Sequence, residues 1–146
     1  MQPPNFDNQG VRVNGGIGCA GCHQAPEFSI DPNSLNNGVI ANANAPGTDL
    51  LVTRSPTLRD VVKVDGTSNG PFMHIGVSNN LTTVLNHYDA INLAGNNNID
   101  PRLTPNGFGQ QLNLTQAEKD AVIAFLRTLG GNDVYTNDKW SDPFIP

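Results

Sequence analysis

The chain has 146 residues, of which 37% are hydrophobic, and a net charge of −5 at neutral pH. This length fits one domain over residues 1–146, with a core of about residues 9–130 and a C-terminal tail over residues 131–146. The acidic balance without a basic cluster argues against nucleic acid and anionic membranes as partners, and no apolar run is long enough to span a bilayer.

The first half of the chain is expected to be an arm followed by loops. Residues 1–15 are polar and are expected to lead into a short helix. Met1 is followed by neither a basic nor an apolar segment, so we expect a mature or excised chain without a signal peptide. Residues 24–57, and later residues 92–113, are rich in turn formers and are expected to be long loops, the first of them held mainly by a bound group.

A helix is predicted over residues 80–89. Its apolar positions recur at the helical period and share one face, which comprises Leu81, Val84, Leu85 and Tyr88. Asn79 or Asn80 is expected to cap its first turn, because an Asn side chain accepts a hydrogen bond from a free backbone amide there. His87 points away from this face.

The last helix has the clearest pattern. Thr115 and Glu118 have the spacing of a capping box, and Gly130-Gly131 is expected to stop the helix. Its apolar stripe comprises Val122, Phe125, Leu126 and Leu129. Because no alternating strand pattern is strong anywhere, the predicted fold class is all-α with extensive loops.

The five residues Cys19-Ala20-Gly21-Cys22-His23 carry the chemistry. Two thiols three residues apart on one helical turn suit thioether bonds to the two vinyl groups of a haem, and His23 then stands under the iron. We therefore predict one covalent haem c on Cys19 and Cys22, with His23 as an iron ligand. A zinc site would need the distant His74 or His87, a thioredoxin-like pair expects a βαβ unit, and a disulfide does not account for the adjacent histidine.

Further segments match a known family, in the family's order. They are Ala25-Pro26-Glu27-Phe28, Arg54-Ser55-Pro56-Thr57-Leu58-Arg59-Asp60-Val61, Pro71-Phe72-Met73-His74-Ile75-Gly76, Leu81 to Tyr88, and Leu114 to Leu129. With the cysteine motif, this set resembles the C-terminal, electron-transfer haem domain of the bacterial di-haem cytochrome c peroxidases and of the related methylamine-utilisation di-haem enzymes. The resemblance implies a class I cytochrome c-like fold and electron transfer. Peroxidase activity does not carry over, because those enzymes have two haems and this chain has one attachment motif.

The ligand on the other face of the iron is left open among three residues, a water molecule and a vacant position. In the peroxidases a Met late in the helix after the Pro-aromatic-x-His segment is the ligand, and in the methylamine-utilisation relatives a Tyr takes its place. The matching position here is Tyr88. Met73 is the alternative metal ligand, because thioethers are common ligands in electron-transfer cytochromes, and His74, a haem-pocket residue in the family, is the third. A Met ligand favours ferrous iron, whereas a phenolate favours ferric iron.

The resemblance also assigns other cofactor-binding positions. Arg54 and Arg59 flank Pro56 and are expected to pair with haem propionates, because a guanidinium fork suits carboxylates. Leu58 and Phe72 are expected to pack on the porphyrin.

The predicted function is electron transfer by a periplasmic or secreted mono-haem cytochrome. Its partner is expected to be a basic or neutral redox protein, since the chain is acidic. The alternative is a haem peroxidase or oxidase-like enzyme that acts at an open or Tyr-ligated iron. Bound calcium, which the family holds near the positions of Asn69 and Pro71, is not expected, because one ligand would come from the family's other domain.

Overall fold

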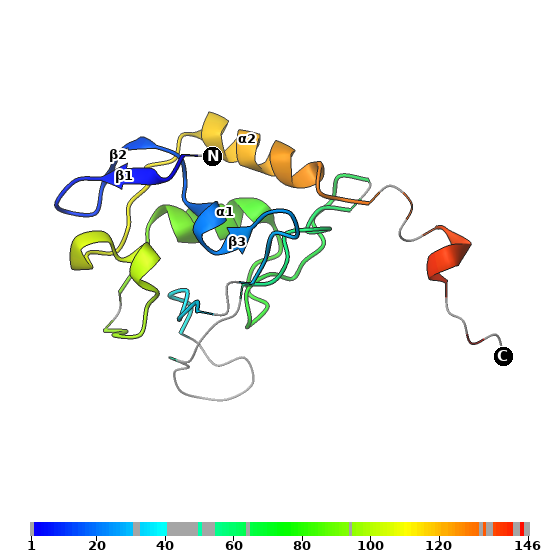
Figure 1. Cartoon of the computed structure of the whole chain (residues 1–146), viewed down its shortest axis with the longest axis horizontal. Coiled ribbons are helices and arrows are strands. Elements are labelled where there is room, and N and C mark those ends of the chain that lie inside the picture. The colour runs from blue at the N-terminus through cyan, green and yellow to red at the C-terminus, as the bar shows by residue number, and fades with distance from the viewer. Residues whose placement is uncertain are drawn as a thin grey trace.

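The computed structural model describes residues 2–30, 33–40, 50, 55–63, 65–93, 95–131, 133, 136–141 and 144. Two α-helices, α1 (Leu81–Asp89) and α2 (Gln116–Arg127), lie beside each other (Figure 1). Four short strands precede them: β1 (Pro4–Phe6), β2 (Arg12–Gly15), β3 (His23–Gln24) and β4 (Ser29–Ile30). Four 3-10 turns complete the described elements: η1 (Cys19–Gly21), η2 (Pro101–Leu103), η3 (Pro105–Gly107) and η4 (Asp138–Trp140).

The predicted all-α, class I cytochrome c-like fold is wrong. β1 and β2 form an antiparallel ribbon, and β3 and β4 form a second one. The expected arm over residues 1–15 is the first ribbon, and the expected loop after His23 contains the second. The strands are two to four residues long and mostly polar, so they carry no alternating pattern. Contacts remote in sequence support them, such as the 2.8 Å hydrogen bond from the Arg12 amide to the Gln111 carbonyl.

Both predicted helices are confirmed. The Asn80 side chain caps α1 by accepting a 2.9 Å hydrogen bond from the Thr83 amide. Thr115 and Glu118 form the predicted capping box of α2. This helix ends at Arg127, before the glycine pair, where the Thr128 amide hydrogen-bonds back to the last turn.

The hydrophobic core lies where the two helices meet the segment around residue 62. Val62, Leu81 and Leu126 are its buried centre. Partly buried side chains pack around them: Leu58, Val61, Phe72, Val122, Ile123 and Leu129. Both predicted faces contribute to this core, but the prediction for Phe125 is wrong, because its side chain is 39% exposed.

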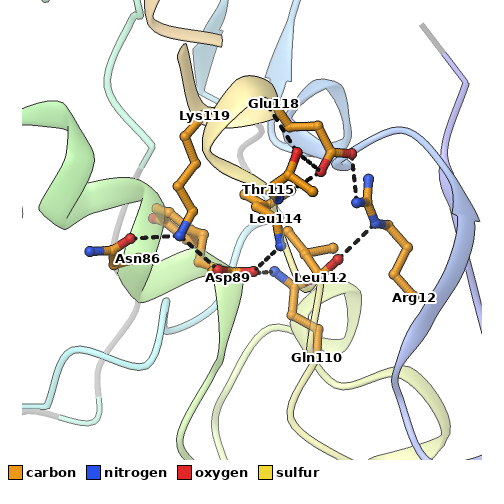
Figure 2. A network of polar contacts seen from close by, with 10 residues as sticks. Arg12, Asn86, Asp89, Gln110, Leu112, Leu114, Thr115, Glu118 and Lys119 are labelled. Atoms are coloured by element: carbon orange, nitrogen blue, oxygen red, sulfur yellow. Dashed lines mark hydrogen bonds and ion pairs between the residues drawn. The ribbon is translucent and has the colours of Figure 1, made fainter. Parts of the chain in front are cut away.

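Polar contacts join β2, the end of α1 and the start of α2 (Figure 2). Arg12 donates to the Leu112 carbonyl at 2.8 Å and pairs with Glu118 at 2.6 Å. Lys119 of α2 pairs with Asp89, the last residue of α1, at 2.9 Å. These contacts hold the helices and the first ribbon together at one end of the molecule.

The described part of the C-terminal tail extends away from the rest of the chain (Figure 1). Trp140 is 60% exposed and lies under the Lys139 ammonium group at 4.7 Å, so it does not pack the tail back onto the core. In the described residues, no helix is long and apolar enough to cross a membrane.

Candidate haem-attachment site

The attachment motif lies on an irregular turn. Cys19 begins the 3-10 turn η1, the Cys22 amide donates to the Cys19 carbonyl at 3.2 Å, and His23 begins β3. Gly18 precedes the turn with φ of 80°, a left-handed conformation that glycine adopts without strain. Neither cysteine forms a disulfide. Burial raises the pKa of the Cys19 thiol, with the nearby Cys22 as a smaller cause in the same direction.

Backbone carbonyls orient the imidazole of His23. Its Nδ1 lies 3.2 Å from the Phe28 carbonyl, and the Pro56 carbonyl is a second hydrogen-bond partner of the ring. A carbonyl only accepts hydrogen bonds, so the contact with Phe28 favours the tautomer that carries its proton on Nδ1. Burial lowers the pKa of His23, against the opposing effect of these hydrogen bonds, and so favours the neutral ring that binds metals.

The segment over residues 55–59 is attached to the segment over residues 26–28. The Leu58 amide donates to the Phe28 carbonyl at 3.1 Å, and the Thr57 hydroxyl donates to the Glu27 carbonyl at 2.7 Å. Arg59 pairs with Glu27 at 3.1 Å and donates to a neighbouring backbone carbonyl at 2.8 Å. The pairing of Arg59 with a propionate stays a prediction, and Arg54 lies outside the described residues.

Two of the three candidate distal ligands meet at one amide. The Asn37 side-chain amide lies 3.4 Å from the Tyr88 hydroxyl and 3.8 Å from the Met73 sulfur. The His87 Nε2 donates to the Asn37 carbonyl at 2.8 Å, and its ring meets the Tyr88 ring edge-on with centroids 5.0 Å apart. His74, the third candidate, is exposed. Asn37 was not predicted, since it is one of many Asn residues in loops.

The pKa of the Tyr88 phenol depends on its burial and on nearby groups. Burial raises the pKa of its phenol above the usual value, and the Asn37 hydrogen bond acts in the opposite direction. Charges on Cys22 and Cys19 raise it further. The Tyr88 phenol and the two thiols are therefore near enough to interact electrostatically.

Arg102 is a site residue that the sequence analysis missed. Its Nη1 donates to the carbonyl of Gly21, between the two cysteines, at 2.5 Å. Its Nε and Nη2 bind the two carboxylate oxygens of Asp100 at 2.7 and 2.6 Å. The local sequence Asp100-Pro101-Arg102 indicates only a capped turn, so nothing in it points to a partner 81 residues away.

The residues of the turn fit a covalent haem. Two cysteines outside any disulfide and an imidazole with an available Nε2 form the donor set that c-type haem attachment needs. Among the described residues, no group of three His, Cys, Asp or Glu side chains is arranged to hold a metal ion. Leu58 and Phe72 pack at the edge of the core cluster, and their contact with a porphyrin stays a prediction.

Comparison with solved structures finds a protein of similar fold. A MauG-like protein associated with microbial copper homeostasis superposes with a TM-score of 0.59 and 22% sequence identity. The match covers 88% of this chain but 47% of that protein, so this chain spans about half of its length. No family model and no curated protein sequence matches the chain.

Proposed function

We propose that the chain is a c-type haem protein that carries one haem on Cys19 and Cys22 and transfers electrons, with His23 as the first axial ligand. The observation that carries the proposal is the turn itself: it holds two thiols outside any disulfide beside His23, whose Nδ1 lies 3.2 Å from the Phe28 carbonyl, and Arg102 donates to the carbonyl between the cysteines. The similarity to a MauG-like protein supports a haem-related redox role, because it agrees with the resemblance of the sequence to methylamine-utilisation di-haem enzymes.

Each residue has a distinct task in this proposal. A bound haem would supply a one-electron ferric–ferrous couple. The Phe28 carbonyl holds the Nδ1 proton of His23, which fixes the ring and keeps Nε2 basic. Tyr88 is the proposed second ligand, with Met73 as its alternative. The Asn37 side-chain amide contacts both the Tyr88 hydroxyl and the Met73 sulfur. The proposed compartment is the periplasm or the cell exterior.

Mass spectrometry of the protein produced with a haem-attachment system tests the proposal. The peptide that contains Cys19 and Cys22 should carry the mass of one haem, and the alkaline pyridine spectrum should show two saturated vinyl groups. Cys19→Ser should shift that spectrum toward a single thioether, and the Cys19→Ser/Cys22→Ser variant should release its haem on acid–acetone extraction. Unmodified thiols in the wild-type protein would contradict the proposal.

Peroxidase or oxidase-like chemistry is the second candidate. The observation that favours it is the electrostatic interaction of the Tyr88 phenol with the two cysteines of the turn. The methylamine-utilisation enzymes that the sequence resembles have a Tyr as iron ligand, and the structural neighbour is a MauG-like protein. Turnover of hydrogen peroxide by the reduced haem protein, measured with an added electron donor, separates the two functions. Rapid turnover with cyanide binding favours the enzyme, whereas an iron inert to both favours the carrier.

A further inference from the structure

An ion pair between the buried Asp100 and the partly exposed side chain of Arg102 connects the attachment turn with the loop that carries Asn37. Asp100 is 2% exposed, and its carboxylate accepts from the Leu35 amide at 2.9 Å as well as from the Arg102 guanidinium and amide. The Asp100 amide in turn donates to the Asn36 carbonyl at 2.9 Å. Arg102 then reaches Gly21. The pair therefore touches both segments that border the proposed site.

Arg102 makes more hydrogen bonds than the cap of a 3-10 turn requires. The Arg102 backbone amide alone would cap the 3-10 turn η2 on Asp100, at 3.0 Å. The side chain adds a bidentate pair, which is the strongest form of the arginine–carboxylate contact. The remaining Nη1 is then aimed at a carbonyl between the cysteines, and a Cβ on Gly21 would lie 3.5 Å from the Arg102 Cδ.

We propose that Arg102, oriented by Asp100, is the positioning residue of the attachment turn and that its cation helps to set the reduction potential of the bound haem. The inference rests on the proposed function, because it needs a haem on that turn. The inference gives a role to the Arg102–Asp100 ion pair, which lies outside the segments that resemble the family.

The sign of the effect follows from Coulomb's law. Ferric haem carries one more positive charge than ferrous haem, so a nearby cation favours the ferrous form and a nearby carboxylate favours the ferric form. Arg102 contacts the turn directly, whereas Asp100 lies behind it. Removal of the cation should therefore lower the potential, and removal of the carboxylate should raise it.

Spectroscopic redox titration of the haem-loaded protein tests this inference with opposite variants. At the wild-type midpoint potential, we expect Arg102→Met to raise the ferric-to-ferrous ratio about threefold, which is about 28 mV for a one-electron couple. We expect Asp100→Asn to lower that ratio by a similar factor. A role in folding alone would shift both variants in the same direction, because both break the same ion pair.

Two further variants complete the experiment. Arg102→Lys keeps the charge and should hold the ratio within about a factor of 1.5 of the wild-type value. If Arg102→Met does not fold, Arg102→Gln, which also removes the charge, replaces it in the comparison. Arg12→Met is the matched control, since Arg12 also bridges a carboxylate and a backbone carbonyl, without a contact to the turn, and it should leave the ratio nearly unchanged.

Two results would overturn different conclusions. A wild-type protein without thioether-linked haem would refute the proposed function, and this inference with it. A haem-loaded protein in which the Arg102 and Asp100 variants shift the potential together, or not at all, would refute the inference alone. Opposite shifts, with Arg102→Lys close to the wild type, would support it.

Discussion

At the scale of single residues, the site is organised by backbone carbonyls and one amide. The Phe28 carbonyl fixes His23, and the Asn37 amide contacts both Tyr88 and Met73. The sequence predicted the three ligand candidates because their residue types carry the chemistry. It did not predict Asn37, since the role of that residue depends on where a loop is held and not on a pattern.

The distal ligand is tested by two substitutions. We expect Tyr88→Phe to change the ferric absorption and EPR spectra and to raise the potential, because loss of a phenolate removes a preference for ferric iron. Met73→Leu should leave the ferric coordination intact, since the leucine only replaces a packing contact. Loss of a low-spin thioether signature in Met73→Leu, with an unchanged spectrum in Tyr88→Phe, would reverse the assignment.

At the scale of elements, the helices were predictable and the ribbons were not. α1 and α2 have caps and apolar faces encoded within about a dozen residues, so local sequence suffices. The strands, by contrast, depend on partners elsewhere in the chain, as in the Arg12 amide bond to Gln111. The family resemblance also implied an all-α fold, and its two longest matched segments after residue 80, Leu81 to Tyr88 and Leu114 to Leu129, do contain the two α-helices.

The start of α2 should make stability depend on acid pH. Hydrogen bonds from the Thr115 amide, from Arg12 and from the Thr115 hydroxyl lower the pKa of Glu118 from 4.5 to about 2. Its stabilising effect is therefore complete above pH 4.5 and is lost as the pH falls through about 2. Thermal unfolding of the haem-free protein should show a weaker loss of stability between these pH values in Glu118→Gln than in the wild type.

One further variant tests this dependence of stability on acid pH, and one result would contradict it. Arg12→Met should weaken the acid dependence in part, because it removes one of the hydrogen bonds that lower the Glu118 pKa. Identical pH profiles for the wild type and Glu118→Gln would show that the contact in Figure 2 has no effect on stability.

The junction between the helices rests on Asp89. Its carboxylate pairs with Lys119 at 2.9 Å and accepts from the Leu114 amide at 2.8 Å. We expect Asp89→Ala to lower the free energy of unfolding by about 1–3 kcal/mol, because a partly buried amide and ammonium group lose their acceptor. Urea unfolding measures the change. Lys119→Met, which leaves the Leu114 bond in place, should cost less, and an equal or larger cost would contradict this assignment.

At the scale of the whole molecule, charge is expected to control encounters with redox partners. The chain has a net charge of −5, to which haem propionates would add. We expect electron transfer to a basic cytochrome c to slow severalfold as the Debye length falls from about 30 Å at 0.01 M salt to about 10 Å at 0.1 M. Stopped-flow rates across this range measure it. An acidic redox protein is the control, and the same salt dependence with both proteins would exclude steering by net charge.

The account as a whole requires a haem that exchanges electrons reversibly while bound to the Cys19–His23 turn. A redox titration of the purified haem protein, followed by absorbance, tests this most directly. The account predicts one reversible transition that follows the Nernst equation for a single electron, with the haem still attached to Cys19 and Cys22 by mass spectrometry afterwards. A protein without haem, or one whose transition is irreversible or involves more than one electron, would contradict it.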